Sequence, residues 1–220
     1  MAIVPTFFVG DISLDRYYRA GAWPVMGDRV AMDVLEEQIG GMVANAARVH
    51  AGFGQPTEFI SILNNGQLTQ ELKAGLLAAN VGISHLAHHD DEPDPQTVVI
   101  MVGDEDVIFW ANPSTLPIPL RADTLEALTC PGYLYSTAGR LARLVGPAGE
   151  SAAQVLHTIR QAGRELILDL DADGLQLADS EFARGAHTVL MNEHGFTRSA
   201  IADKTAWLDG HEITELIVTL

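Results

Sequence analysis

Short apolar runs bounded by glycine, proline or acidic residues recur along the chain, a pattern typical of buried strands. The first run covers residues 2–9 and ends at Gly10-Asp11. Because it is continuously apolar despite Pro5, we expect it to be a central strand of a sheet. Runs of the same kind predict further strands at residues 57–63, 81–86, 133–136, 165–170, 188–191 and 215–220.

Between these strands, apolar residues spaced by helical turns predict helices. One amphipathic helix is expected to end near Asn80, on the spacing of Leu68, Leu72, Leu76 and Leu77. A second is expected over residues 151–162, with Ser151 as its N-cap and Gly163 after its end. Strands that alternate with helices imply parallel pairing and right-handed crossovers, so the pattern predicts an α/β fold.

Two segments interrupt this alternation. Residues 17–38 contain two glycines and a proline that break any helix, and we expect a short strand or two over residues 29–39. Residues 97–102 and 107–110 read as strands joined by a Gly-Asp-Glu-Asp turn, a hairpin signal. A hairpin within a series of strands and helices predicts a small separate sheet.

The chain is organised around a glycine pair, Gly40-Gly41, which is followed by a helix of small residues that ends at Gly52 and Gly54. Glycine backbone can approach a bound ligand closely. The first turn of a helix also presents unpaired N–H groups, which suit hydroxyl or anionic ligand atoms. Asn45 lies in that turn or just beyond it. Taken alone, a glycine pair more often marks a tight turn before a packed helix.

Polar residues follow the carboxyl ends of several expected strands. Asp11, Ser13 and Asp15 alternate just beyond the first strand, and the strand at residues 165–170 leads into Asp171. Ligands in open α/β sheets bind at this edge, where carboxylates can accept hydrogen bonds from sugar hydroxyls. Capping of the loop by the same carboxylates is an equally good interpretation at this point.

Histidines and aspartates gather in one stretch that has the right atoms for metal binding: His85, His88, His89, Asp90 and Asp91. Pro93 and Pro95 follow directly, and the stretch lies between two expected strands. We therefore expect a solvated loop, and no residue is assigned as a metal ligand.

Composition narrows the range of functions. The 220 residues fit one large α/β domain, or a domain with a small excursion. A net charge of −16 argues against nucleic acid and anionic membranes as partners. Cys130 is the single cysteine, so we expect no disulfide and a cytoplasmic location. The amino terminus lacks the basic region of a signal peptide, and no apolar run is long enough to span a bilayer.

The motifs, taken in order, resemble those of the PfkB or ribokinase family of carbohydrate kinases. Residues 9–15 (VGDISLD) look like the first-strand motif, whose final Asp holds substrate hydroxyls. Residues 40–47 (GGMVANAA), which close at Phe53-Gly54, look like the GGNxANxA…LG signature. Three shorter stretches resemble the VGDDxFG turn, the DPN strand end and the NxxE motif: residues 63–69 (LNNGQLT), 168–171 (LDLD) and 191–194 (MNEH). The resemblance covers essentially the whole chain.

This resemblance implies a ribokinase-like, Rossmann-type three-layer α/β core with a small β-sheet lid over the sugar. The core would comprise residues 1–15, 39–95 and 113–220, and the lid residues 16–38 and 96–112. The implied reaction transfers the γ-phosphoryl group of ATP to a sugar hydroxyl with the help of Mg²⁺ and an Asp base. The implied partners are a small-molecule sugar and a second copy of the chain, bound through the lid.

The resemblance also implies roles for individual residues. The sugar-binding positions would be Asp11, Ser13, Asp15, Gly40, Gly41 and Asn45. The positions on the nucleotide side would be Asp169, Asn192 and Thr219.

The sequence departs from the family pattern at several positions. Met42 stands where the family usually has Asn or Lys, Asn64 and Asn65 replace Gly and Asp, and Gly195 replaces the Glu of NxxE. No Gly-Ala-Gly-Asp occurs in the 220 residues. We therefore expect the adenine pocket, the anion hole and the catalytic Asp of the family to be missing, as in a fragment of a longer kinase or a shortened relative. The 220 residues alone are then expected to be inactive.

Three hypotheses remain open. The chain can be the sugar-binding half of a carbohydrate kinase, a non-catalytic sugar-binding or regulatory homologue, or a structural α/β module whose lid serves assembly. Stabilisation by a sugar would separate the first two from the third. Phosphate transfer would separate the first from the second.

Overall fold

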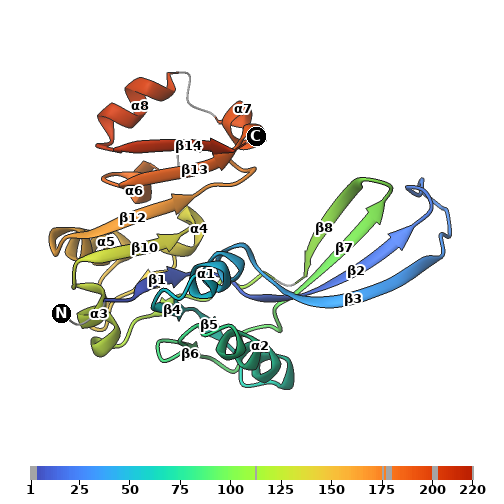
Figure 1. Cartoon of the computed structure of the whole chain (residues 1–220), viewed down its shortest axis with the longest axis horizontal. Helices are drawn as coiled ribbons and strands as arrows, with labels where there is room; N and C mark the ends of the chain where they lie inside the picture. The colour runs from blue at the N-terminus through green and yellow to red at the C-terminus, as the bar shows by residue number, and fades with distance from the viewer. Residues whose placement is uncertain (1–3, 112, 175, 177–179, 200–202, 220) are drawn as a thin grey trace.

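The structure is a computed structural model, and it describes residues 4–111, 113–174, 176, 180–199 and 203–219. It consists of an α/β core from which a long, narrow sheet extends to one side (Figure 1). This arrangement confirms the predicted fold class, a parallel α/β core with a small additional sheet.

In the described residues, the central sheet has six strands, all parallel, in the order β14-β13-β12-β10-β1-β4. The strands are β1 (Thr6–Val9), β4 (Thr57–Ile60), β10 (Gly132–Ser136), β12 (Arg164–Asp169), β13 (Thr188–Asn192) and β14 (Glu215–Thr219). The chain runs from β1 outward to β4, and then returns to the other side of β1 to form β10. The order therefore reverses at β1, which makes its carboxyl end the place where such sheets bind ligands.

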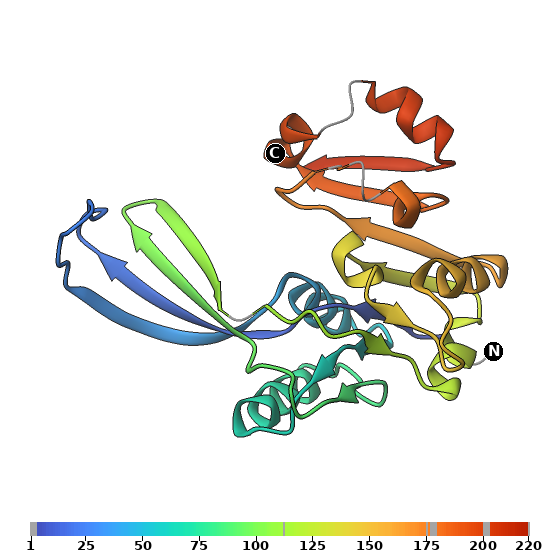
Figure 2. The same ribbon diagram turned by 180° about the vertical axis from the view of Figure 1, so that it is seen from behind.

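Helices cover both faces of this sheet, as the two opposite views in Figures 1 and 2 show. Phe8 and Phe59 point to the face covered by α1 (Met42–Gly52) and α2 (Gln67–Ala78). Phe7 and Leu134 point to the opposite face. That face is packed by α3 (Ala122–Leu128), α5 (Ala152–Gln161), α6 (Ser180–Ala183) and α8 (Lys204–Gly210). Alternation of side chains along each strand thus builds two apolar layers.

The helix α5 begins and ends where the sequence predicts. The Ser151 hydroxyl accepts a hydrogen bond from the Gln154 amide at 3.4 Å, and the Gln154 side chain accepts one from the Ser151 amide at 2.8 Å. This reciprocal pair is a capping box, which satisfies two amide groups that the helix leaves open. Gly163 ends the helix with a φ of +87°, a conformation that favours glycine.

The extended sheet contains β2 (Ser13–Ala20), β3 (Met32–Gly40), β7 (Gln96–Val102) and β8 (Glu105–Ala111), in the order β3-β2-β7-β8. The expected hairpin is present, with Gly103 and Asp104 at its turn and a φ of +61° at Gly103. The ranges predicted for the lid, residues 16–38 and 96–112, overlap these strands. We call this sheet the lid.

Some sequence predictions of single elements are wrong. The strand β2 was not expected, so Ser13 and Asp15 lie inside a strand and not in a loop beyond β1. The run at residues 57–63 is interrupted at Ser61, after which β5 (Ile62–Leu63) pairs with β6 (Ala87–His88). Residues 81–86 form a single bridge, between Gly82 and Glu58, because their apolar side chains are buried against α2 without a strand. Burial produces the same sequence pattern in either conformation.

Short elements that the sequence did not indicate complete the core. They are β9 (Ile118–Pro119), which pairs with β11 (Leu144–Val145), the helices α4 (Ala138–Leu141) and α7 (Glu193–Arg198), and also α3, α6 and α8. Each is too short to show a helical or strand period in the sequence.

A buried arginine connects α3 to the central sheet. Arg164 is 3% exposed and donates to the carbonyl oxygens of Leu128 at 2.7 Å, Tyr133 at 2.9 Å and Ala127 at 3.0 Å. Two of these carbonyls belong to the last turn of α3, where no helical donor is available. Burial lowers the pKa of the guanidinium, yet arginine stays protonated in proteins.

We expect Arg164→Gln to lower the free energy of unfolding by about 2–4 kcal/mol, because buried carbonyl groups lose their donors. Urea denaturation measures this change. Arg19→Gln, at an exposed position on the lid, is the matched control and should shift the free energy by less than about 0.5 kcal/mol. An Arg164→Gln protein that unfolds at the wild-type urea concentration would contradict this account of the buried arginine.

Candidate functional site

A pocket of about 320 Å³ lies beyond the carboxyl ends of β1, β10 and β12. Its walls come from parts of the chain that are far apart in sequence. Asp11 follows β1, Met42 begins α1, Trp110 comes from the lid strand β8, Arg140 from α4, and Asp169 from the end of β12. The pocket therefore sits at the point where the strand order reverses, which is where α/β sheets place their ligands.

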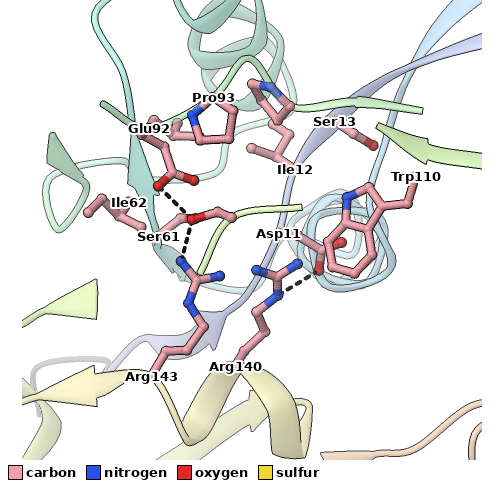
Figure 3. A pocket seen from close by; sticks show the side chains of 13 residues that line it. Asp11, Ile12, Ser13, Ser61, Ile62, Glu92, Pro93, Trp110, Arg140 and Arg143 are labelled. Carbon is pink, nitrogen blue, oxygen red and sulfur yellow. Dashed lines mark hydrogen bonds and ion pairs between the residues drawn. The ribbon is translucent and has the colours of Figure 1, made fainter. Parts of the chain in front are cut away.

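A smaller cavity adjoins this pocket at the base of the lid. Its volume of about 30 Å³ is enough for a water molecule. Figure 3 shows its lining, to which Ser13, Ser61 and Glu92 contribute. The two cavities share Asp11, Trp110, Ser114, Arg140 and Arg143.

Most of the predicted sugar-side residues lie together where β1, β2 and β3 meet. Asp11 lines both cavities and Ser13 lines the smaller one. The Ser13 hydroxyl donates to Asp15 Oδ1 at 2.6 Å, and Gly40 packs so closely on the Asp15 carboxylate that a Cβ there would collide with it. A Cβ on Gly41 would lie 2.7 Å from the carbonyl oxygen of Asp11. The glycine pair is thus required by close contacts within the chain itself.

Asn45 lies in a different place. It is exposed on α1, and its Oδ1 accepts a hydrogen bond from Arg48 at 3.4 Å. It lines a separate, mainly apolar hollow of about 550 Å³, together with Phe8 and Tyr135. The residue of α1 that lines the pocket with Asp11 is Met42. The structure therefore does not bring Asn45 into the pocket that holds Asp11.

The predicted nucleotide-side residues end neighbouring strands. Asp169 closes β12, while Asn192 and Thr219 are register partners at the ends of β13 and β14. The Asn192 side chain donates to Asp171 Oδ1 at 2.9 Å. Asp169 and Asp171 line the pocket that also contains Asp11. One residue of each predicted group, Asp11 on the sugar side and Asp169 on the nucleotide side, thus lines the same pocket.

Tyr135 is a residue at this edge that sequence reasoning missed. Its hydroxyl donates a hydrogen bond to Asp169. Burial, and then the bond to Asp169, raise the pKa of Tyr135, so the phenol keeps its proton at neutral pH. Since tyrosine is common in strands, nothing in the sequence distinguishes this one.

The position of Gly195, where the family motif has Glu, is tightly packed. Gly195 is buried, and a Cβ on it would collide with the carbonyl oxygen of Asp171. Gly174 lies against the same stretch of backbone, and a Cβ on Gly174 would collide with the carbonyl oxygen of Gly195. The geometry of this turn therefore leaves no space for an acidic side chain at position 195.

Two arginines near the lid were also missed. The Arg140 guanidinium lies 4.9 Å from the Trp110 ring centroid, and its Nε lies 3.8 Å from Asp11 Oδ1. Arg143 donates to Leu116 O at 2.7 Å and to the Ser114 hydroxyl at 2.8 Å. Neither arginine belongs to a motif or to an element that the sequence predicts, so no signal could have identified them.

The histidine-rich stretch makes ordinary polar contacts. His85 Nδ1 hydrogen-bonds with Thr124 Oγ1 at 2.9 Å, and His89 lies 3.9 Å from Asp91. Among the described residues, there is no group of three or more His, Cys, Asp or Glu side chains that could hold a metal ion. In the same part of the chain, no helix is long and apolar enough to cross a membrane.

Comparison with protein families and curated proteins gives consistent results. The family model of the pfkB family carbohydrate kinases matches residues 7–220. The bifunctional protein HldE of Ectopseudomonas mendocina (strain ymp) is 25% identical over 198 residues, which cover 87% of this chain and 40% of that protein. HldE of Pseudomonas syringae pv. tomato (strain DC3000) is 24% identical over 195 residues, or 86% of this chain and 39% of that protein. The chain thus spans about two fifths of the length of these curated relatives.

Solved structures confirm the fold. Arabidopsis thaliana ribokinase complexed with ribose and ATP superposes with a TM-score of 0.71 at 20% identity, covering 97% of this chain and 71% of that one. Ribokinase from Giardia lamblia gives a TM-score of 0.75 at 13% identity and covers 100% of this chain and 70% of that one. Since the family model matches nearly the whole length, the chain belongs to the pfkB family of carbohydrate kinases.

Proposed function

We propose that this chain forms the sugar-binding half of a kinase that transfers the γ-phosphoryl group of ATP to a sugar hydroxyl. One observation supports the proposal most directly: a single pocket has Asp11 on one side and Asp169 and Asp171 on the other. In the proposed reaction the hydroxyl oxygen bonds to the γ-phosphorus, the bond to the β–γ bridging oxygen breaks, ADP leaves and the hydroxyl proton is released.

The sugar would lie at the base of the lid, against Asp11 and Asp15. Carboxylates there accept hydrogen bonds from sugar hydroxyls. The Ser13 hydroxyl, which donates to Asp15 at 2.6 Å, holds that carboxylate in one orientation. Trp110 covers the pocket from the lid side.

ATP would lie beside Asp169, Asn192 and Thr219, at the ends of β12, β13 and β14. ATP as the donor is supported by the family, and the Arabidopsis ribokinase structure contains ribose and ATP. The fit of Mg²⁺ is poor in the described residues. They include no group of three potential metal ligands, and Asp169 and Asp171 are engaged by Tyr135 and Asn192. We derive no step through a metal from this part of the chain.

A non-catalytic sugar-binding protein is the second candidate. Two observations favour it: position 195 has no space for an acidic side chain, and the apolar Met42 begins α1 beside the pocket. Its distinguishing property would be sugar binding without phosphate transfer.

The lid strands also bear exposed apolar side chains, which support the proposal of a dimer. The register of the strands places Val34 in one row with Tyr18, Ile100 and Val107. Val34 is 74% exposed, and Phe109, on the same face, is 53% exposed. Ile108 and Trp110 belong to the opposite face, the one that carries Asp15. Monomers rarely expose large apolar patches, so we propose that a second copy covers the face with Val34.

We expect Asp15→Ala to abolish stabilisation by the cognate sugar while the fold stays intact. A sugar hydroxyl that loses its acceptor in a buried site costs about 1–3 kcal/mol. Thermal unfolding with a panel of pentoses, hexoses and keto-deoxy sugars measures the effect, and Asp104→Ala in the lid turn is the control. Equal stabilisation of wild type and Asp15→Ala would contradict the assignment. A wild type that no sugar stabilises would instead favour the assembly module.

The 220-residue polypeptide is expected to show no phosphoryl transfer by itself, even where it binds a sugar. The far end of its pocket is lined by the acceptor groups of Asp169, Asp171 and Asp173, whereas phosphoryl transfer needs hydrogen-bond donors around the developing charge. A coupled assay with ATP, Mg²⁺ and the same sugar panel measures turnover. Activity that survives purification and is lost in Asp15→Ala would prove this prediction wrong.

Val34→Glu is expected to convert a dimer to a monomer, because a buried charge without a partner is costly in an apolar interface. Ile108→Glu, on the opposite face of the lid, should leave the dimer intact. Sedimentation velocity over a range of concentrations distinguishes these cases. A wild-type protein that stays monomeric at high concentration without sugar would count against the dimer.

A further inference from the structure

The guanidinium of Arg140 is largely buried in the pocket but has no hydrogen-bond partner within the described residues. Its side chain is 11% exposed. The nearest carboxylate, Asp11, lies 3.8 Å from Nε, a distance at which charges attract without a hydrogen bond. Figure 3 shows the guanidinium next to Asp11 and near the Trp110 ring, beside the cavity. Its N–H groups are therefore available to a molecule in the pocket.

A guanidinium in this position is energetically costly. It has five N–H donors, and a cation removed from water is destabilising unless it is paired and hydrogen-bonded. The Trp110 ring contributes a cation–π contact, which does not satisfy the donors. An anion with two oxygen atoms could bind in the fork of the guanidinium and satisfy several donors at once.

Arg143 adds a second positive charge nearby, and two of its three guanidinium nitrogens, Nε and Nη2, are hydrogen-bonded. It binds Leu116 O and the Ser114 hydroxyl, and Ser114 in turn donates to the buried Glu92 at 2.6 Å. The Ser114 hydroxyl thus links the Arg143 guanidinium to the Glu92 carboxylate through two hydrogen bonds. Burial, and then repulsion by the charge of Arg140, lower the pKa of Arg143. An anion beside Arg140 would relieve this repulsion.

The positive charge of Arg140 in the pocket wall is unusual, because the protein as a whole is strongly acidic. The chain has 13 Lys and Arg against 29 Asp and Glu. A surface so acidic repels anions in general, so an anionic ligand would need a local cation of this kind. Arg140 provides it at the wall where the proposed sugar would lie.

We propose that the sugar bound in this pocket carries an anionic group, a phosphate or a carboxylate, and that Arg140 binds this group while Trp110 stacks on the guanidinium. This inference rests on the proposed function, because it names the class of sugar that the pocket takes. Asp11 and Asp15 would bind hydroxyls of the same molecule.

Binding of matched neutral and acidic sugars tests the proposal. The pairs are ribose with ribose 5-phosphate, glucose with glucose 6-phosphate, and glucose with gluconate; the last two pairs separate a phosphate from a carboxylate. Isothermal titration is expected to give about 10- to 100-fold tighter binding for the acidic member of at least one pair. Raising the salt concentration should weaken that member selectively. The emission of Trp110 should change on binding, and Trp110→Phe should remove this change.

The arginine variants identify the group responsible. Arg140→Gln should remove the preference for the acidic sugar while neutral sugars bind as before, and Arg140→Lys should keep part of it. Arg121→Gln removes the same charge from an exposed site that lies outside both cavities, and should leave the preference unchanged. Circular dichroism checks that each variant is folded. If Arg140→Gln does not fold, the preference for the acidic sugar is compared between the wild type and Arg140→Lys.

Two results would overturn the inference, and they are distinguishable from failure of the proposed function. Neutral sugars that bind as tightly as their acidic partners would refute the anionic class alone. Arg140→Gln that weakens both members of a pair equally would refute the role of Arg140 alone. If no sugar of either kind binds, the proposed function itself fails and the inference falls with it.

Discussion

The junction between the core and the lid depends on close backbone contact at Gly40 and Gly41. Gly40 ends β3 directly against the Asp15 carboxylate, and Gly41, the N-cap of α1, lies against the carbonyl of Asp11 with a φ of +95°. A side chain at position 40 would displace the Asp15 carboxylate, and one at position 41 would push α1 away from the backbone of Asp11 and Ile12. Since these contacts fix Asp11 and Asp15 relative to one another, they also fix the wall of the pocket at the base of the lid.

Polar contacts determine how the second pair of lid strands joins the core. Asn64 donates to the Glu92 carbonyl at 3.0 Å and to Asp94 Oδ1 at 2.8 Å, which holds the segment that leads into β7. Glu92 then accepts from Ser114 in the segment that leaves β8. Asn64 is a departure from the family turn, and its amide is used for this attachment. The entry and exit of the lid are therefore linked to each other as well as to the core.

The sequence was sufficient for the parallel core, the hairpin and the glycine pair, because strand runs, turn residues and small-residue contacts depend on local pattern. It was insufficient where the role of a residue depends on neighbours that are distant in the sequence. Ser13 and Asp15 belong to β2, and the sequence alone does not show that β3 and β7 flank this segment. Asn45 follows the family motif, yet lines a different hollow from the pocket that holds Asp11. Arg140 has no local signature, since its environment is made by β1 and β8.

The two ends of the pocket differ in how their polar groups are satisfied. At the end with Asp169, internal hydrogen bonds from Tyr135 and from the Asp171 amide occupy the carboxylate, and close backbone contact at Gly195 excludes further side chains. At the end with Arg140, the guanidinium has an ion pair at 3.8 Å and an aromatic ring, but its donors are open. Groups that are already satisfied gain little from a ligand, whereas an open buried donor gains a full hydrogen bond. Selectivity for a ligand is therefore expected to reside at the lid end of the pocket, where residues of β1, α4 and β8 meet.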